Sequence, residues 1–445
     1  MSSQAEMTQS AASYEHTSQA FDPVVHTSID FLERLFDGLD RRNFAVRFWE
    51  GTSWPSNNHA RFTLALRRPE ALRAMFLNPS EIALGEAYIY GDCDIEGDIF
   101  AAMELGDYLL GKDRRATELL RLKTLLHKLP SPSRGQAIRY GVKLDGSPHS
   151  KERDRRAISY HYDLPAGFYR GWLDRRMVYS CAYFNASDED LETAQLNKLD
   201  YICRKLRLRP GERLLDIGCG WGALVMHAAA QYGVNAAGIT LSVPQAEIAN
   251  AKINEAGLDH LCRVEVRDYR DLDSAEGYDK LVSVGMFEHV GEKLLPQYFG
   301  HAWRILRPGG VFLNHGIAAS AGVKGNGPSF ATRYVFPDGE LVPISTTLRV
   351  AENAGLEVRD VESLREHYPL TLRKWVHRLE AGADEARRLT DDVTYRIWRL
   401  YMAGYARQFE TGKLSVYQTL LAKPSRQDKS ELPLTRDDWY INSAL

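Results

Sequence analysis

The sequence predicts a doubly wound α/β domain with a mainly parallel sheet, preceded by a smaller α+β domain. From about residue 204 onward, strand patterns alternate with helical patterns, which is typical of a parallel sheet covered by helices. The first of these strands runs directly into a glycine-rich loop. The chain has 445 residues, more than one hydrophobic core usually organises, so we expect two domains.

The smaller domain is expected over residues 30–111, after a polar, disordered tail at residues 1–29. Its predicted elements are two strands, a short helix opened by proline and a stretch that mixes glycines with apolar and acidic residues: 44–51, 60–68, 69–77 and 83–105. No catalytic motif is present in this part of the sequence. A small binding module is therefore the plain interpretation.

A basic segment follows at residues 112–156, with 13 lysines and arginines against 5 acidic residues, a local net charge of +8. Four of its leucines have helical spacing: Leu119, Leu122, Leu126 and Leu129. Such a helix can lie on anionic lipid, or it can pack its leucines on a neighbouring domain, and the pattern does not decide between the two. Residues 130–135, PSPSRG, end the helix and begin a linker.

The larger domain is expected over residues 157–423, followed by a charged, peripheral tail at residues 424–445. Its predicted elements, in order, are strand 213–218, helix 222–232, strand 234–242, helix 244–257, strand 262–272, strand 279–285, helix 294–306 and strand 308–317. Residues 372–412 are helical again, and residues 414–423 predict the last strand.

Composition and charge argue against several classes of protein. A net charge of -3 does not indicate nucleic-acid binding. The five cysteines form no C-x-x-C pair, which argues against a zinc site or a disulfide framework and suits a reducing cytoplasm. No run approaches the roughly 20 apolar residues that span a bilayer. We expect a cytoplasmic protein without a metal site, and whether it forms a homodimer stays open.

The loop LLDIGCGWG, residues 214–222, ends a strand and leads into a helix. Its three glycines allow a tight turn and let a ligand approach the backbone closely. A dinucleotide site would also need an acid at the end of the second strand, where Thr240, Leu241 and Ser242 stand. With Asp216 leading in, the D-x-G-x-G-x-G form instead resembles the S-adenosylmethionine loop of Rossmann-like methyltransferases.

A second motif, SVGMFEHVG at residues 283–291, follows a run that is typical of a buried strand. It places Glu288 and His289 beyond a strand end, where open α/β sheets bind ligands. Glu288 alone could also be an acid at a helix N-terminus. His289 more often packs or bonds locally than reacts, so we leave it out of the candidate site.

Seven motifs occur in one order along the chain: HYDLPAGFYRGWLDRRMVYSCAYF (161–184), LLDIGCGWG, GITLSVPQ, RDYRDL, SVGMFEHVG, LNHGI and REHYPLTL (365–372). Together they resemble the cyclopropane-fatty-acyl-phospholipid synthases, relatives of the mycolic acid cyclopropane synthases. The resemblance is strong over about residues 160–423 and weak in the front domain, which is similar to the lipid-binding module of the bacterial enzymes. It implies a Rossmann-like methyltransferase domain with a small lipid-binding domain.

The resemblance implies a site for S-adenosylmethionine as the methylene donor. The residues that it implies are Tyr179, Ser180, Leu214, Asp216, Gly218, Cys219, Gly220, Gly222, Thr240, Leu241, Gln245, Tyr269 and Arg270. The first two would contact the cofactor, and those from Leu214 to Gly222 would wrap its methionine part. The next three would lie beside the ribose, and the last two beside the adenine.

The resemblance also implies a bicarbonate ion beside the sulfonium methyl group. Its implied ligands are the backbone at Cys181 and Ile317 and the side chains of Glu288, His315 and Tyr368. A cis double bond that attacks the methyl group leaves a carbocation on the neighbouring carbon. A proton must then leave the new methyl group before a ring can close, and bicarbonate would accept it.

Two observations argue against a thiol nucleophile. Cys181 could be a buried small hydrophobe, and nothing around it in the sequence marks it as reactive. Near the C-terminus the family often carries a cysteine where this chain, in GYARQF, has Tyr405. The bicarbonate mechanism needs no thiol.

We therefore expect cyclopropanation of cis double bonds in unsaturated acyl chains of membrane phospholipids, by a protein peripherally associated with the inner face of the membrane. One alternative, within the same fold, is a fatty-acyl C-methyltransferase that gives methyl-branched chains because the proton leaves elsewhere. Retention of Glu288, His315 and Tyr368 favours ring closure. The other alternative is a lipid-binding protein whose methyltransferase domain is inactive.

Overall fold

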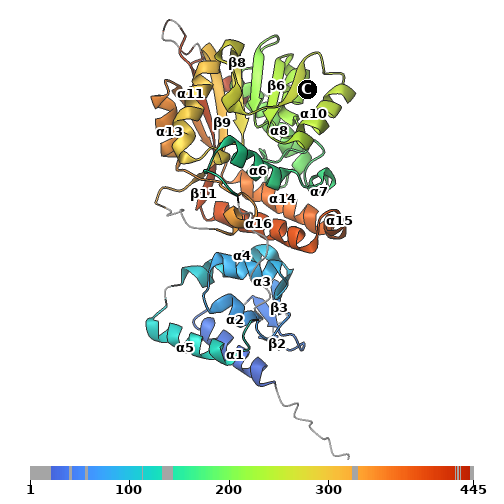
Figure 1. The fold of residues 1–445 in the computed structure, drawn as a ribbon, viewed down its shortest axis with the longest axis vertical. Coiled ribbons are helices and arrows are strands. Elements are labelled where there is room, and N and C mark those ends of the chain that lie inside the picture. Colours follow the sequence, from blue (N-terminus) through green and yellow to red (C-terminus); the bar gives the residue numbers. More distant parts are fainter. Residues whose placement is uncertain are drawn as a thin grey trace, which may run out of the picture.

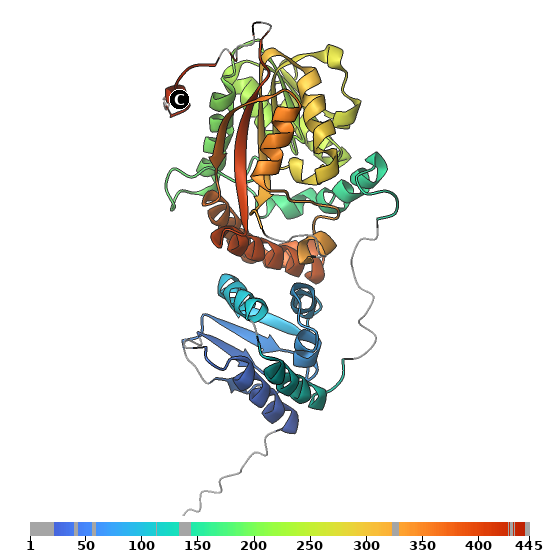
Figure 2. The same cartoon turned by 90° about the vertical axis from the view of Figure 1, so that its left-hand side faces the viewer.

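The computed structural model describes residues 22–39, 43–55, 59–112, 114–132, 144–322, 329–425, 427, 430 and 432–440. The described chain forms a small N-terminal part around a four-stranded sheet and a larger part around a seven-stranded sheet (Figure 1). None of the helices in the described ranges is both long and apolar enough to cross a bilayer. Figure 2 shows that helices from the C-terminal third of the chain lie between the two sheets.

The N-terminal part contains α1 (Pro23–Leu35), β1 (Phe44–Arg47), β2 (Ser53–Trp54), β3 (Phe62–Leu66), α2 (Ala71–Phe76), α3 (Glu81–Ile89), β4 (Cys93–Gly97), α4 (Ile99–Gly111) and α5 (Ala116–Lys128). The two predicted strands and the short helix are present, and the mixed stretch 83–105 forms most of α3, β4 and α4. Helix α1 begins at Pro23, capped by the Asp22 side chain, so the expected tail is wrong for residues 22–29. Residues 1–21 lie outside the described residues.

Helix α5 packs its leucines inside the N-terminal part. Leu122, Leu126 and Leu129 are buried, and α5 contacts α1 and α2. Leu119, which shares the predicted stripe, is 43% exposed, and its neighbour Leu120 is 67% exposed. The packing alternative is therefore confirmed for three of the four leucines. Residues 133–143 of the expected linker lie outside the described residues.

The larger sheet has the strand order β10-β11-β9-β8-β5-β6-β7, and β11 alone among these strands runs antiparallel to its neighbours. Its strands are β5 (Arg213–Ile217), β6 (Asn235–Thr240), β7 (Cys262–Val266), β8 (Tyr278–Val284), β9 (Leu306–Ala319), β10 (Glu357–Ser363) and β11 (Leu414–Ala422). The prediction of a mainly parallel, doubly wound sheet is confirmed. The third predicted strand ends at Val266 rather than residue 272, because Asp268 caps a 3₁₀ turn over Tyr269–Asp271.

Helices cover both faces of this sheet. The helices of the larger part are α6 (Lys151–Tyr162), α7 (Ala166–Arg170), α8 (Leu191–Leu206), α9 (Ala223–Tyr232), α10 (Val243–Glu255), α11 (Leu295–Ile305), α12 (Phe330–Tyr334), α13 (Ile344–Asn353), α14 (His367–Ala381), α15 (Ala383–Leu389), α16 (Asp392–Glu410) and α17 (Asp437–Tyr440). Because side chains alternate along a strand, Leu214 joins the core under α8 to α10 and Leu215 joins the core under α11 and α13. Trp439 of α17 is buried in the first of these cores, so the expected peripheral tail is wrong there.

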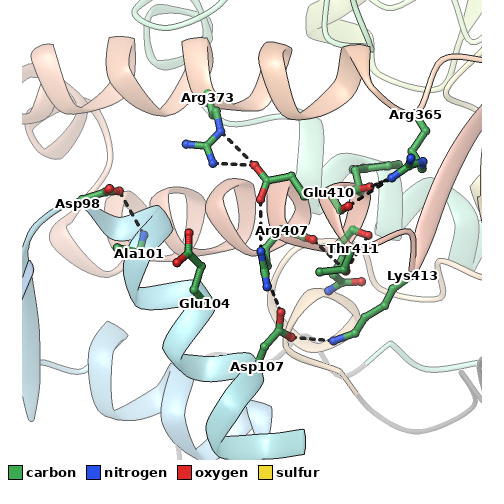
Figure 3. Close-up of polar contacts among 12 residues, drawn as sticks. Asp98, Ala101, Glu104, Asp107, Arg365, Arg373, Arg407, Glu410, Thr411 and Lys413 are labelled. Carbon is green, nitrogen blue, oxygen red and sulfur yellow. Dashed lines mark hydrogen bonds and ion pairs between the residues drawn. The ribbon is translucent and has the colours of Figure 1, made fainter. Parts of the chain in front are cut away.

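The N-terminal part docks on α16 through α3 and α4. Asp107 of α4 accepts hydrogen bonds from Arg407 Nε at 2.8 Å and from Lys413 Nζ at 2.7 Å (Figure 3). The ring of Phe330 lies so close to Gly85 of α3 that a Cβ atom there would be 2.5 Å from it. Helix α16 therefore carries contacts to the N-terminal part on one side and, as shown below, part of a cavity wall on the other.

Candidate functional site: two joined cavities

The first cavity lies at the carboxyl ends of β5, β6 and β8, where parallel α/β sheets bind ligands. Its empty space is about 1170 Å³, a volume that includes space open to solvent. The predicted cofactor residues that line it are Tyr179, Ser180, Asp216, Gly218, Cys219, Gly220, Thr240, Leu241, Gln245, Tyr269 and Arg270. The sheet thus gathers segments that are up to 91 residues apart in the sequence.

The glycine loop brings its backbone to this cavity. Gly220 has φ +54° and no atom within 4 Å of the position of a Cβ, so it faces open space. Gly218 has φ +85°, and a Cβ there would be 2.6 Å from the Cβ of Met286. Gly222 packs against Ala249, and Leu214 is fully buried in the sheet. Neither of these last two residues lines the cavity, and their contact with the cofactor stays a prediction.

Two opposite charges are buried in the wall near the loop. Asp216 is 2% exposed, and burial raises the pKa of its carboxyl to about 7, an effect that the Lys198 charge partly offsets. Lys198 of α8 donates a hydrogen bond from Nζ to Ser180 Oγ at 2.7 Å. Sequence reasoning missed Lys198. The available signal was its position on the buried stripe of α8, between Gln195 and Ile202, where a lysine is unusual.

The far end of the cavity is ordered by its own polar contacts. The Thr240 hydroxyl donates to Gln245 Oε1 at 2.8 Å, which fixes both side chains at the end of β6. The guanidinium of Arg270 donates to Asp268 at 2.6 Å and forms an ion pair with Asp154 of α6 at 3.0 Å. Helix α6 thus closes one side of the cavity, with Asp154 in its lining.

The second cavity adjoins the first. Its lining includes all five residues predicted to hold bicarbonate: Cys181, Glu288, His315, Ile317 and Tyr368. It shares Tyr162, Tyr179, Ser180, Gly285 and His289 with the first cavity. The remaining wall is aromatic and apolar, with Phe336, Leu341, Tyr401, Tyr405 and Val416. His289, which we left out of the candidate site, therefore lies at the junction.

Glu288 has one oxygen bonded and one free. It is the acid in the first turn of a short 3₁₀ helix, Phe287–His289, and its side chain does not cap that helix. Its Oε1 accepts the backbone N–H of Ile317 at 2.7 Å. Its Oε2 is buried and has no hydrogen-bond partner among the described residues. Burial raises the pKa of this carboxyl to about 7. The N–H of Ile317 thus orients Glu288, a role that the sequence did not predict.

His315 and Tyr368 present neutral polar groups to the same cavity. The Nδ1 atom of His315 lies 3.3 Å from Nε2 of Gln418, while its Nε2 is buried and unpartnered within the described ranges. Burial lowers the pKa of His315 to about 3, so the imidazole is neutral. With the Gln418 amide donating to Nδ1, the proton of His315 lies on Nε2 and points away from β11. Burial raises the pKa of the Tyr368 hydroxyl, which stays protonated.

In this geometry neither the Cys181 sulfur nor Tyr405, which stands where the family often has cysteine, acts as a nucleophile. Cys181 is fully buried, burial raises the pKa of its thiol, and its Sγ donates to the carbonyl oxygen of Ala182 at 3.4 Å. Such a thiol is inert. Tyr405, where the family often has cysteine, packs its ring against Tyr401 with centroids 4.9 Å apart. Its role in the second cavity is that of an aromatic wall.

Comparison with known proteins places this geometry in a family. The model of the mycolic acid cyclopropane synthetase family matches residues 149–419, and a domain of unknown function, DUF7884, matches residues 31–105. The chain is 39% identical to a probable fatty acid methyltransferase of Pseudomonas putida, over 89% of this chain and 95% of that protein. It is 37% identical to the probable fatty acid methyltransferase Rv3720 of Mycobacterium tuberculosis, over 90% of this chain and 96% of that protein.

A solved structure gives the same result for the larger domain. The mycolic acid cyclopropane synthase CmaA1, crystallised with SAH and CTAB, is 34% identical and covers 60% of this chain and 97% of its own, with a TM-score of 0.57. The larger domain thus has the fold of S-adenosylmethionine-dependent methyltransferases. The chain belongs to the mycolic acid cyclopropane synthetase family.

Proposed function

We propose that this protein transfers the methyl carbon of S-adenosylmethionine to a cis double bond of an unsaturated acyl chain and then closes a cyclopropane ring. The observation that carries the proposal is the junction of the two cavities at Tyr179, Ser180 and His289. A cofactor in the first cavity would meet a substrate in the second cavity there, without either crossing bulk water. Family membership supports both the cofactor and the class of substrate.

The first cavity suits S-adenosylmethionine, which supplies an electrophilic methyl group on a sulfonium sulfur. The open backbone at Gly220 admits the amino-acid arm, and Thr240 and Gln245 offer hydroxyl and amide groups to a ribose. Tyr269 presents a ring and a buried hydroxyl that lacks a partner in the described chain. The related CmaA1 structure was solved with SAH, which supports this assignment.

The second cavity suits a small anion with one O–H group, and the orphaned atoms carry that argument. An ionised Glu288 Oε2 accepts an O–H, while His315 Nε2–H and the Tyr368 hydroxyl donate to oxygen. Bicarbonate in this place would supply a base for the proton that leaves the new methyl group. Glu288 holds the orientation of such an ion because Ile317 fixes its other oxygen.

The aromatic wall would guide the acyl chain and face the positive carbon. Tyr162, Tyr179, Phe336, Tyr401 and Tyr405 line the second cavity. Aromatic faces attract a cation within about 6 Å of the ring centroid, by about 2 kcal/mol or more when it is desolvated. The tyrosine hydroxyls stay protonated, because burial raises the pKa of Tyr401 and Tyr405. The wall therefore offers no competing nucleophilic oxygen anion.

A second function, formation of a methyl-branched chain, is favoured by the names of the relatives that match nearly the whole chain. Both are probable fatty acid methyltransferases, whereas the CmaA1 structure covers only the larger domain. The two reactions share the attack on the sulfonium methyl group and differ in the bond that forms when the proton leaves. A ring and a methylene branch add the same CH₂ to the chain, so mass alone does not separate them.

The test is therefore an analysis of the product by ozonolysis. Purified protein is incubated with S-adenosylmethionine and vesicles of a cis-unsaturated phospholipid. The masses of the acyl chains are then measured by mass spectrometry before and after treatment with ozone. Ring closure predicts a chain that has gained CH₂ and resists ozone. A chain that has gained CH₂ and is cleaved by ozone supports the branched product. If no S-adenosylhomocysteine is released, the protein is inactive on such chains and the proposal is wrong.

We also propose that the outer face of α5 docks on an anionic bilayer, which would supply the substrate. Its exposed basic and leucine residues include Arg115, Leu119, Leu120, Arg121, Lys123 and Lys128. Basic residues near an anionic surface contribute about 1 kcal/mol each, and exposed leucines insert between head groups. Arg114 does not belong to this face, because its side chain is 7% exposed and pairs with Glu118 at 3.2 Å.

Sedimentation with phosphatidylglycerol and phosphatidylcholine vesicles tests the docking face. Replacing Arg115, Arg121, Lys123 and Lys128 by Gln should weaken binding to the anionic vesicles by more than tenfold, as should added salt. The matched control replaces four exposed arginines of the larger domain, with the same change in net charge: Arg175, Arg209, Arg263 and Arg388. Equal loss in both variants would show that only net charge matters, and no loss in either would show that α5 is a connector.

A further inference from the structure

Lys198 is a buried lysine that forms no ion pair with the described residues, although it feels the charge of the buried Asp174. Its side chain comes from α8, is 2% exposed and lines the first cavity. Nζ donates to Ser180 Oγ at 2.7 Å, and burial lowers the pKa of Lys198, an effect that the charge of Asp174 partly offsets without an ion pair between the two described residues. An ammonium carries three donors, so two remain for a ligand. Burying an unpaired charge is costly, which indicates that something else completes this site.

Asp216 shows the complementary deficit in the same cavity. It ends β5 beside the glycine loop, and its Oδ1 is buried without a hydrogen-bond partner among the described residues. Lys198 and Asp216 influence each other electrostatically, yet they form no ion pair. The cavity therefore holds two buried ionisable groups, an ammonium and a carboxyl, and neither forms an ion pair within the described residues.

An α-amino acid has the matching pattern, because its carboxylate and its ammonium sit on one carbon. We infer that Lys198 binds the α-carboxylate of the cofactor's methionine arm, while Asp216 faces its α-ammonium group. The inference rests on the proposed function, since it assumes that S-adenosylmethionine occupies the first cavity. It adds a residue, Lys198, to which neither the motifs nor the family resemblance gave a role.

The position of Lys198 gives the contact a second consequence. Its hydrogen-bond partner Ser180 lies in the wall of both cavities. A carboxylate on Lys198 would therefore fix the arm of the cofactor relative to the junction, where the methyl group must be presented. Lys198 is in this sense a binding and positioning residue, and it takes no part in the proton transfer.

Binding measurements with three ligands test the inference: S-adenosylhomocysteine, its decarboxylated analogue and methylthioadenosine, which lacks the amino-acid arm. Isothermal titration calorimetry should show that the wild type binds S-adenosylhomocysteine about ten- to a hundredfold more tightly than the decarboxylated analogue, the usual worth of a charged hydrogen bond. In Lys198→Met, affinity for S-adenosylhomocysteine should fall by about the same factor. Affinity for the other two ligands should stay as in the wild type.

Lys252→Met is the matched control. Lys252 is a partly buried lysine of α10 that, like Lys198, feels the charge of Asp174, but it does not line the cavity. Its replacement should leave all three affinities unchanged. Binding of methylthioadenosine by Lys198→Met also shows that the variant is folded around the nucleoside end of the cavity.

The outcomes separate this inference from the proposed function. If the wild type binds none of the ligands, the proposed cofactor is wrong. If it binds S-adenosylhomocysteine and the decarboxylated analogue equally, the cofactor assignment stands and the role of Lys198 is wrong. The wild-type comparison needs no variant, so equal binding of these two ligands would overturn the role of Lys198 even if Lys198→Met does not fold. Equal loss of all three ligands in a folded Lys198→Met would make Lys198 a structural residue and would also overturn the inference.

Discussion

The two joined cavities bury different kinds of polar group. The first holds ionisable groups: the Lys198 ammonium, the Asp216 carboxyl with a pKa of about 7, and the Arg270 guanidinium, which is paired with Asp268 and Asp154. The second holds groups that burial keeps neutral, the His315 imidazole and the Tyr368 hydroxyl, among aromatic rings. Its one carboxyl, Glu288, has a pKa of about 7.

This difference indicates what each cavity is built to receive. Lys198 and Asp216, which form no ion pair with each other, favour a ligand that carries its own charges, such as an amino-acid arm on a nucleoside. A neutral, aromatic cavity favours an apolar chain and penalises every extra charge, so a proton acceptor there must be small and held by few atoms. Substitutions in one cavity should therefore leave the function of the other unchanged.

The largest effect is expected from Glu288→Gln, which changes only the second cavity. An amide keeps the shape of the carboxylate, but its NH₂ group donates where an acceptor is needed. Turnover should fall by a factor on the order of 10²–10⁴, the usual worth of positioned acid–base catalysis. Affinity for S-adenosylhomocysteine should not change. Loss of that affinity together with turnover would show that the two cavities do not act separately.

The converse change, Gly220→Val, should affect the first cavity. A branched side chain at φ +54° would be strained and would project into the open space that the loop leaves. Affinity for S-adenosylhomocysteine should fall roughly 5- to 150-fold, as expected for an overpacking cost of about 1–3 kcal/mol. Gly257→Val is the control, because Gly257 has φ +67°, nothing within 4 Å of its Cβ position and an exposed site on the surface. Similar losses in both variants would mean that backbone strain, not the cavity, sets the affinity.

The titration of Glu288 predicts a smaller, pH-dependent effect on stability. Its pKa rises from near 4.5 in the unfolded chain to about 7 in the folded protein, so between these values the folded state holds a proton that the unfolded state has lost. The free energy of unfolding should therefore fall as pH rises through this window, by up to about 1.4 kcal/mol per pH unit. Asp216 contributes with the same sign in both proteins.

Urea unfolding of wild type and Glu288→Gln at pH 5, 6, 7 and 8 isolates the Glu288 contribution. From pH 5 to pH 7 the free energy of unfolding of the wild type should fall relative to that of Glu288→Gln. Above pH 7 the difference between the two should become constant. A difference that does not depend on pH would show that Glu288 titrates near its ordinary value and that the second cavity tolerates charge.

The smallest effect is expected where the second cavity meets the N-terminal part. Asp107→Asn removes the charge that pairs with Arg407 and Lys413. Burial alone would raise the pKa of Asp107, but the hydrogen bonds from Lys413 and Arg407 lower it below its ordinary value. These groups are partly exposed, so the loss of stability should be at most about 1 kcal/mol. Asp384→Asn should cost less, because the Asp384 side chain is fully exposed in its pair with Arg387. A loss of several kcal/mol would make this network essential for docking.

The sequence predicted the fold best where its pattern was apolar and local. Strands β5, β6, β8 and β9 are buried in the centre of the sheet and stand out as apolar runs. Strand β10 was not predicted, because it is an edge strand whose side chains are mostly exposed or half-buried and which lacks an apolar alternation. Docking of Phe330 against Gly85 joins residues 245 apart, and nothing in either local pattern indicates it.

The candidate site was predictable where motifs end strands and unpredictable where a helix contributes one side chain. All five residues of the predicted bicarbonate site line one cavity, although Ile317 contacts Glu288 instead of facing the cavity with a free N–H. Lys198 was not predicted, because a single lysine on an amphipathic helix resembles a surface residue as long as the buried face of the helix is not known. His289 was set aside because sequence cannot tell which of two adjacent side chains points to the junction.

The central claim is that the second cavity holds a small proton acceptor on Glu288, and a bicarbonate titration tests it most directly. Turnover on unsaturated phospholipid vesicles is measured in carbonate-depleted buffer while bicarbonate is added back, for wild type and for Glu288→Gln. The account predicts that the wild-type rate rises with bicarbonate and saturates, while the variant stays slow at wild-type affinity for S-adenosylhomocysteine. A wild type indifferent to bicarbonate, together with a fully active variant, would contradict it.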